Sequence, residues 1–440
     1  MNLTSPQKYI TVSPLLLRAD THAKEITLHA GTPYVQKFLD DTARILVYPM
    51  DSVVPTVVIL HDETPAASFR RAENGDLILS VQTPEEGEYT ILLDKANADG
   101  TFTELFTLQF YALKDDLFVL NPYKGDFHMH SSCSDGRQPP AYVAATCRRN
   151  GFDFMALTDH FQYAPSLTAQ KAMADFGCTM LVFSGEEVHA PDNPVHIVNF
   201  GGSASVNELI KKDEKIYRDG IAEYMKFLPE SYDELTKFQI AASEWVYDQI
   251  RITGGLAIYS HPFWAPRHHY YVGAKVNDIM LQRRNFDAVE VFGGFYLEQT
   301  ESNMLSLSRW QQENLAGSQM LNPVGVSDCH DCDADLAGWY YTIVFAEKPD
   351  FKSIAAAIRN GRCVAVHQQP GCFPIAAGEY RLVKFTYFLL REFYPRHDEL
   401  CRDEGEAMRR ELSGNGSDAA KVLALYGNRV WEYMASVWEK

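Results

Sequence analysis

From residue 121 onwards, strand-length apolar runs alternate with stretches of helical character. This alternation is typical of βα units that build a largely parallel sheet. The predicted strands span residues 125–129, 152–157, 180–184, 195–200, 256–259, 288–292 and 324–326, followed by a βα repeat at 341–345, 351–360 and 362–366. We therefore expect an α/β fold arranged as a distorted, TIM-like (β/α)7 barrel.

The first part of the chain has a different pattern, with short β segments separated by turn residues. The predicted strands are 44–49, 53–60, 76–82, 89–93 and 103–111. Short strands without helical periodicity indicate a small all-β, sandwich-like domain. We expect this domain over residues 1–120 and the α/β domain over 121–378, with an insert near 205–240. Residues 379–440 should form a mainly helical C-terminal extension.

Composition narrows the classes of partner. The chain has 440 residues, of which 58 are acidic and 40 basic, so its formal charge is −18. This charge argues against nucleic acid as the partner. The sequence has no signal-peptide pattern and no run of about 18 uncharged apolar residues, so we expect a cytoplasmic protein without a membrane span. The eight cysteines lack the spacing of a disulfide scaffold, and the lone Cys329-x-x-Cys332 has no second pair to complete a zinc ribbon.

Histidines and acids gather at the ends of the predicted strands. The residues are His128, His130, Asp135, His160, Glu187, His196, His261, Asp328 and His330. All lie at or just after a strand end except His196, which begins a strand. A single histidine in such a place is more often a core or capping residue. However, the carboxyl ends of barrel strands converge on one face, so the whole series predicts one pocket.

These nine side chains have the donor types of a metal-binding set. A tetrahedral ion takes four ligands, so nine imply two or three ions. Imidazole and carboxylate donors together suit zinc, iron and manganese better than magnesium or calcium. We treat the eight remaining histidines as surface residues or as supports behind the ligands. They are His22, His29, His61, His189, His268, His269, His367 and His397.

The motif series is H-x-H, S-D-G, T-D-H, G-x-E, a later H, S-H-P and S-D-x-H, in that order over residues 123–366. It resembles the polymerase and histidinol phosphatase (PHP) family of metal-dependent phosphoesterases. The resemblance implies a distorted (β/α)7 barrel with up to three ions. It places His128, His130, Glu187 and Asp328 around the first ion, Glu187, His196 and His261 around the second, and Asp135, His160 and His330 around the third.

Glu187 would then bridge two ions, although by spacing alone Glu186 is an alternative. The family pattern favours Glu187, which directly precedes the β-branched Val188. Asp159 is expected to orient a ligand imidazole. We expect Glu187, Asp328, His261 and Asp159 to be the catalytic residues.

The expected reaction is hydrolysis of a small-molecule phosphate mono- or diester by a metal-bridging hydroxide. A nuclease or polymerase-associated exonuclease-like module, and a carboxylic or carbamic ester hydrolase, are the alternatives. Arg137, Arg267 and His268 are candidates for binding substrate, and Phe263 and Trp264 for an apolar wall beside a leaving group. The alternative is that Arg137, Arg267 and His268 are ordinary surface charges and that Phe263 and Trp264 pack in the interior. A homo-oligomer is possible, but the sequence does not fix the oligomeric state.

Overall fold

The structure is a computed structural model that describes residues 9–55, 57–60, 69–266, 268–294, 299–317, 320–334, 336–416 and 418–439. The chain divides into two compact units, which are described separately. The first comprises Met1–Asn121, Lys384–His397 and Asn428–Lys440, and the second comprises Pro122–Val383 and Asp398–Gly427. The domain limits given above stay predictions.

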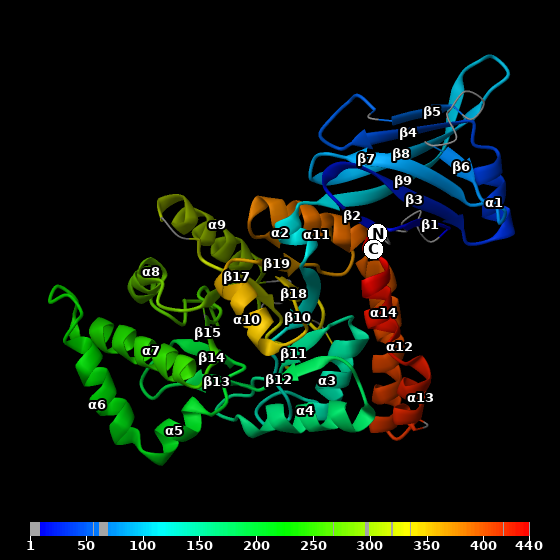
Figure 1. The fold of residues 1–440 in the computed structure, drawn as a ribbon. Coiled ribbons are helices and arrows are strands. Elements are labelled where there is room, and N and C mark those ends of the chain that lie inside the picture. Colours follow the sequence, from blue (N-terminus) through cyan, green and yellow to red (C-terminus); the bar gives the residue numbers. More distant parts are fainter. Residues whose placement is uncertain are drawn as a thin grey trace. The chain divides into compact units, whose positions relative to one another are not determined.

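The first unit contains two β-sheets (Figure 1). One has the strand order β1-β3-β7-β6 and the other β2-β9-β8-β4-β5. Alternate residues of β7 and β8 are buried, as expected when each sheet has one face turned to a core. The strands are β1 Ile10–Ser13, β2 Leu16–Arg18, β3 Asp20–Ala30, β4 Arg44–Pro49, β5 Val57–Leu60, β6 Phe69–Arg71, β7 Leu77–Thr83, β8 Gly87–Ala96 and β9 Phe102–Leu113.

Two short helices of this unit, α1 (Pro33–Asp40) and α2 (Asp115–Phe118), join or follow these strands. The sequence did not predict α1 or the strands β1, β2, β3 and β6. The first half of β3 reads Asp-Thr-His-Ala-Lys and is mostly exposed, so it lacks the apolar alternation that identifies a strand.

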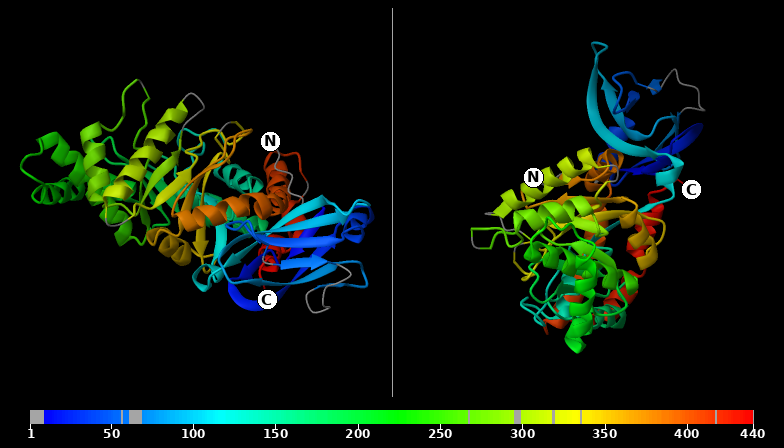
Figure 2. Two further views of the ribbon diagram at one scale, coloured as in Figure 1. Left: turned by 90° about the horizontal axis from the view of Figure 1, so that it is seen from above. Right: turned by 90° about the vertical axis from the view of Figure 1, so that its left-hand side faces the viewer.

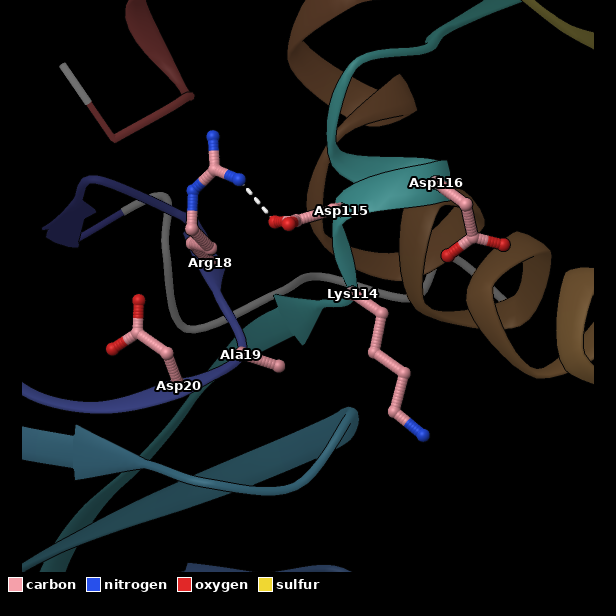
Figure 3. A pocket seen from close by; sticks show the side chains of 6 residues that line it. All are labelled: Arg18, Ala19, Asp20, Lys114, Asp115 and Asp116. Atoms are coloured by element: carbon pink, nitrogen blue, oxygen red, sulfur yellow. Dashed lines mark hydrogen bonds and ion pairs between the residues drawn. The ribbon is translucent and has the colours of Figure 1, made fainter.

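A shallow hollow lies on the first unit (Figure 3). Its lining consists of Arg18, Ala19, Asp20, Lys114, Asp115 and Asp116. Arg18 donates a hydrogen bond to Asp115, and Asp20 accepts one from Lys24, so opposite charges are paired around the hollow.

The second unit is mixed α/β and holds two sheets. Their strand orders are β12-β11-β10-β18-β19-β20 and β13-β14-β15-β16-β17. The strands are β10 Asn121–Asp126, β11 Phe154–Ala156, β12 Leu181–Phe183, β13 Gly185–His189, β14 His196–Phe200, β15 Leu256–Tyr259, β16 Ala288–Gly293, β17 Pro323–Val326, β18 Tyr340–Ala346, β19 Cys363–His367 and β20 Ile375–Ala377.

The predicted α/β class is confirmed, but the strands of the described residues do not form a closed (β/α)7 barrel. β10, β11 and β12 pair in parallel, as do β15, β16 and β17. In contrast, β13, β14 and β15 pair antiparallel, and so do β18, β19 and β20. The connections β13–β14 and β19–β20 are short, as antiparallel neighbours allow, whereas helices lie between β14 and β15 and between β18 and β19. Isolated parallel bridges link the segments after β10 and β17, at Met129–Cys329, and the segment after β11 to β13, at His160–Glu187.

Helices connect most of these strands. They are α3 Pro140–Arg149, α4 Ala164–Phe176, α5 Val206–Lys212, α6 Glu214–Met225, α7 Glu234–Ile252, α8 Ala274–Arg283, α9 Thr300–Ala316 and α10 Phe351–Arg359. The predicted insert near 205–240 contains α5, α6 and the start of α7. These helices pack together as one group, green in Figures 1 and 2.

The last part of the chain is helical, as expected, with α11 Tyr380–Glu392, α12 Tyr394–Leu412, α13 Ala419–Tyr426 and α14 Arg429–Ser436. Part of α12 belongs to the second unit, where Arg148 of α3 donates a 2.8 Å hydrogen bond to Glu404 of α12. Both side chains are almost fully buried. This ion pair therefore ties α12 to the second unit's core.

A buried carboxylate ties the ends of β10 and β17 together. Asp126 is fully buried and accepts hydrogen bonds from the backbone N–H groups of His128 and Ser327, at 3.2 Å and 3.1 Å. Burial raises the pKa of Asp126 to about 7, although these hydrogen bonds oppose the shift. The segments that carry His128 and Asp328 are thereby held next to each other.

Candidate metal centre

The nine predicted ligands come together in the second unit. Groups of side chains place one donor atom each within 4.8 Å of one another. They include His130/Asp135/His160/His330, His128/His130/Glu187, His128/His261/Asp328 and His160/Glu187/His189. Strands β10, β11, β13, β14, β15 and β17, or the loops directly after them, supply all of these residues.

Glu187 lies at the centre and is fully buried. On one side, its Oε1 atom is 2.9 Å from His196 Nδ1 and 3.3 Å from His261 Nε2. These two imidazole nitrogens are themselves 3.3 Å apart. One carboxylate oxygen and two imidazoles thus converge on a single small volume.

The other oxygen of Glu187 faces a second set of imidazoles. Oε2 is 2.6 Å from His160 Nδ1, 3.5 Å from His128 Nε2 and 3.6 Å from His130 Nε2. The two oxygens of one carboxylate therefore serve two adjoining groups, which is the geometry of a bridging ligand.

Glu186 faces the opposite way, because successive strand residues alternate between the two faces of a sheet. Its carboxylate is fully buried and accepts hydrogen bonds from Ser205 Oγ and Val206 N at 2.6 Å each. Asn207 and Asn199 donate two more, at 2.9 Å and 3.2 Å. Glu186 therefore anchors the start of α5, whereas the Glu187 carboxylate lies among the imidazoles.

Asp328 completes the first group. Its Oδ1 atom lies 2.9 Å from His130 Nε2 and 3.4 Å from His128 Nε2. The backbone φ angles are +48° at Asp328 and +29° at His261, a region that costs energy for residues other than glycine. Such strain is typical of functional sites, where the surrounding structure holds the residue in place.

Asp135 marks the exposed edge of the cluster. Its carboxylate lies 3.3 Å from His330 Nε2 and 3.4 Å from His160 Nε2, and 4.0 Å from His130 Nδ1. The side chain of Asp135 is 57% exposed, whereas that of His130 is fully buried. This third group therefore lies at the solvent-exposed edge of the cluster.

The residues fit divalent transition-metal ions. Buried atoms of this cluster have no hydrogen-bond partner of acceptable geometry: His128 Nε2, His130 Nδ1, His160 Nδ1, Glu187 Oε2 and His189 Nε2. An unsatisfied buried polar atom costs about 1–3 kcal/mol, so five in one place need a common partner. Nitrogen and oxygen donors in this proportion suit zinc, iron or manganese.

Electrostatics keeps the carboxylates ionised. Burial by itself raises the pKa of Glu187, but the neighbouring imidazoles, His196 and His128 foremost, lower it well below its usual value. Burial also raises the pKa of Asp328, but the neighbouring imidazoles, His128 foremost, lower it well below its usual value. Burial lowers the pKa of His196 to about 4, so this imidazole is neutral at pH 7.

Comparison with known proteins gives a consistent result. No family model matches the chain. A segment of 64 residues is 42% identical to the DNA polymerase/3'-5' exonuclease PolX of Bacillus subtilis (strain 168), covering 14% of this chain and 11% of that polymerase.

Two solved structures are similar. A two-domain protein of Bacteroides vulgatus ATCC 8482 containing a predicted PHP-like metal-dependent phosphoesterase matches with a TM-score of 0.42 and 20% identity, over 62% of this chain and 71% of that one. A candidate metal-dependent phosphoesterase of Bifidobacterium adolescentis ATCC 15703 matches with a TM-score of 0.33 and 19% identity, over 49% and 91%. Each of these matches is a similarity over part of the chain, in line with the PHP-like series of motifs in the sequence.

This PHP-like centre includes two residues that the sequence analysis missed. Glu290 of β16 is buried; its Oε1 lies 2.7 Å from His128 Nδ1, and its Oε2 accepts a 2.7 Å hydrogen bond from the His261 backbone N–H. It therefore directs His128 Nε2 towards Glu187. This is the usual role of a carboxylate behind a metal-binding imidazole.

His189 is the second missed residue. Its Nε2 atom lies 3.4 Å from Glu187 Oε2, and its ring stacks on that of His196 at 3.7 Å between centroids. The two histidines are directly paired across β13 and β14. The sequence signal is the Glu187-x-His189 spacing, which puts both side chains on one face of a strand.

Asp159 does not act as expected. It accepts hydrogen bonds from the backbone and side chain of Ser131 and of Ser134, at 2.5–3.2 Å. It thus orders the loop that leads from His130 to Asp135 and orients no ligand imidazole. In its place, Glu290 supports the ligand.

The predicted substrate-binding residues receive weaker support. The Arg137 side chain is 78% exposed and pairs with Asp331 at 3.1 Å, while its backbone N–H binds the His330 carbonyl. His268 is exposed. Arg267 lies outside the described residues. The role of all three stays a prediction.

Among the described residues, no helix is both long and apolar enough to cross a bilayer.

Proposed function

We propose that this protein hydrolyses small-molecule phosphate mono- or diesters at a centre of two or three divalent ions. The observation that carries the proposal is the position of Glu187, whose two oxygens face separate groups of imidazoles. A carboxylate in this position suits two neighbouring ions, and paired ions are typical of phosphoryl-transfer sites.

We assign the nine side chains to three ions. His128, His130 and Asp328 would hold one ion together with Glu187, and His196 and His261 would hold the other. Asp135, His160 and His330 would hold a third near the exposed edge. Bound ions of this kind supply a nucleophilic hydroxide at neutral pH and neutralise phosphate charge.

The remaining groups position and support these ligands. Glu290 fixes the ring of His128, Asp126 joins the segments after β10 and β17, and Asp159 orders the loop towards Asp135. The buried members of the cluster exclude water from the inner side, so substrate and water approach from the side of Asp135. We assign no side chain as the proton donor to the leaving alcohol.

A substrate panel tests the proposal. Purified protein loaded with manganese, zinc or iron is assayed with phosphomonoesters, bis-p-nitrophenyl phosphate, aryl carboxylic esters and single-stranded oligonucleotides. We expect turnover of small phosphoesters that disappears in Glu187→Gln and persists in Glu186→Gln. Turnover of carboxylic esters alone would replace the phosphatase with an esterase, and preference for oligonucleotides would favour a nuclease.

A further inference from the structure

A row of aromatic rings passes through the candidate metal centre, with exposed rings at both of its ends. The ring of Phe161 lies 4.7 Å from that of His189, which stacks on His196 at 3.7 Å. Beyond His196 lie Tyr271 at 5.2 Å and Trp264 at 5.9 Å, measured between ring centroids. These separations are within the range of direct aromatic contact.

The row is accessible at both ends. Phe161 is 59% exposed and Tyr271 is 41% exposed. Trp264 packs on Tyr271 at 4.8 Å, and the Tyr271 N–H donates a 2.8 Å hydrogen bond to the Trp264 carbonyl. The two rings are thus held together by the backbone, and they lie beside the ligands His196 and His261.

Phe161 itself is held in an unusual conformation. It directly follows the ligand His160, and its φ angle of 59° is rare for a bulky side chain. Its N–H donates a 3.2 Å hydrogen bond to the carbonyl of Glu187. An exposed phenyl ring kept beside a metal ligand at such a cost is typical of a functional surface rather than of core packing.

The charges at this edge complement the rings. Asp135 is exposed, and the guanidinium of Arg137 is already paired with Asp331. A leaving group carrying further negative charge would meet the Asp135 carboxylate and the protein's net charge of −18. An uncharged, flat leaving group would meet aromatic faces instead.

We infer that this row binds an aromatic ring in the alcohol portion of the substrate, so that the preferred substrates are phosphate esters of aryl-bearing alcohols. The inference rests on the proposed function and names its substrate class. During hydrolysis the phosphorus–oxygen bond to that alcohol breaks, the oxygen of water bonds to phosphorus, and the departing oxygen takes a proton. The row holds the alcohol portion throughout and takes no part in these bond changes.

The test compares benzyl phosphate with ethyl phosphate, because both release a primary alcohol and differ in the aromatic ring. We expect Phe161→Ala to lower kcat/KM for benzyl phosphate by about 5- to 10-fold, the usual worth of one aromatic contact, and to change that for ethyl phosphate by less than about twofold. Phe161→Leu should lower kcat/KM for benzyl phosphate as much as Phe161→Ala does, because leucine lacks an aromatic face. The control is Phe227→Ala, at an 84% exposed phenylalanine between α6 and α7, which should change neither substrate.

Metal content and thermal stability of each variant show whether the centre is intact. Equal losses for both esters, or no loss for either, would overturn the inference while leaving phosphoester hydrolysis standing. If no phosphoester is hydrolysed, the proposed function fails and calorimetric binding still decides the inference. In that case benzylphosphonate must bind the metal-loaded protein more tightly than ethylphosphonate, and Phe161→Ala must remove the difference; otherwise the aromatic site is refuted.

Discussion

Replacing Glu187 and its neighbour Glu186 by glutamine, one at a time, separates a metal bridge from a structural carboxylate. The two residues are adjacent, both are fully buried, and each exchange replaces one oxygen by an NH₂ group. In Glu187→Gln the side chain keeps a single acceptor oxygen, whereas in the wild-type protein two carboxylate oxygens face the imidazoles. In Glu186→Gln the new NH₂ group faces side-chain and backbone groups that are themselves hydrogen-bond donors.

The expected magnitudes differ in kind. Removing a group that only supports a ligand costs about 10- to 100-fold in metal affinity, so loss of the bridge itself should exceed about 100-fold. Glu186→Gln should leave metal affinity unchanged, because its four hydrogen-bond donors belong to β14 and the start of α5. Turning one acceptor into a donor there should cost about 1–3 kcal/mol of unfolding free energy.

Equilibrium dialysis followed by elemental analysis measures the bound metal, and urea unfolding of the metal-free proteins measures stability. Glu187→Gln should lose metal, and Glu186→Gln should keep metal but unfold at lower urea. Loss of metal in Glu186→Gln with full metal in Glu187→Gln would refute the assignment of the bridge.

Three further outcomes follow from the structure. Glu290→Gln should weaken metal binding by about 10- to 100-fold with little change in fold, because His128 loses its orienting carboxylate; dialysis measures it. Arg148→Ala should lower the unfolding free energy by about 3–5 kcal/mol, because the Glu404 carboxylate loses its buried cation; urea unfolding measures it. Chelation should lower the melting temperature, because the ions bind only the folded chain, and reloading with metal should restore it.

Each of these has a result that would contradict it. Unchanged metal affinity in Glu290→Gln would show that the imidazole of His128 needs no outer support. A loss under about 1 kcal/mol in Arg148→Ala would mean that α12 is held by other contacts. A melting temperature that does not change on chelation would indicate that bound ions do not stabilise the folded chain.

Much of the candidate site follows from local pattern. Residues 256–259 were predicted as a strand and are β15, and His261 follows it as expected. His128, His160 and Asp328 likewise come just after β10, β11 and β17. Strand ends are recognisable because a buried apolar run stops abruptly at a polar motif, which is a property of the sequence alone.

What sequence reasoning missed depends on contacts between distant segments. Glu290 binds a histidine 162 positions earlier in the chain. His189 meets His196 only through the register of the β13–β14 pair, and nothing local fixes that register. Glu187 was expected after a strand and lies inside β13, because its buried face is lined by histidines and carboxylates and lacks the apolar side chains that mark a strand. The strands β14, β18 and β19 were predicted as members of a largely parallel barrel, but they pair antiparallel, because strand direction is set by distant pairing that an apolar run does not reveal.

The central claim is that Glu187 bridges two metal ions. Crystals of the metal-loaded protein, measured at the absorption edges of zinc, iron and manganese, locate any ions by anomalous scattering. We expect at least two peaks, one beside each oxygen of Glu187, within coordination distance of His196 and His261 on one side and of His128 and His130 on the other. A fully loaded protein with a single ion, or with ions that do not contact Glu187, would contradict it.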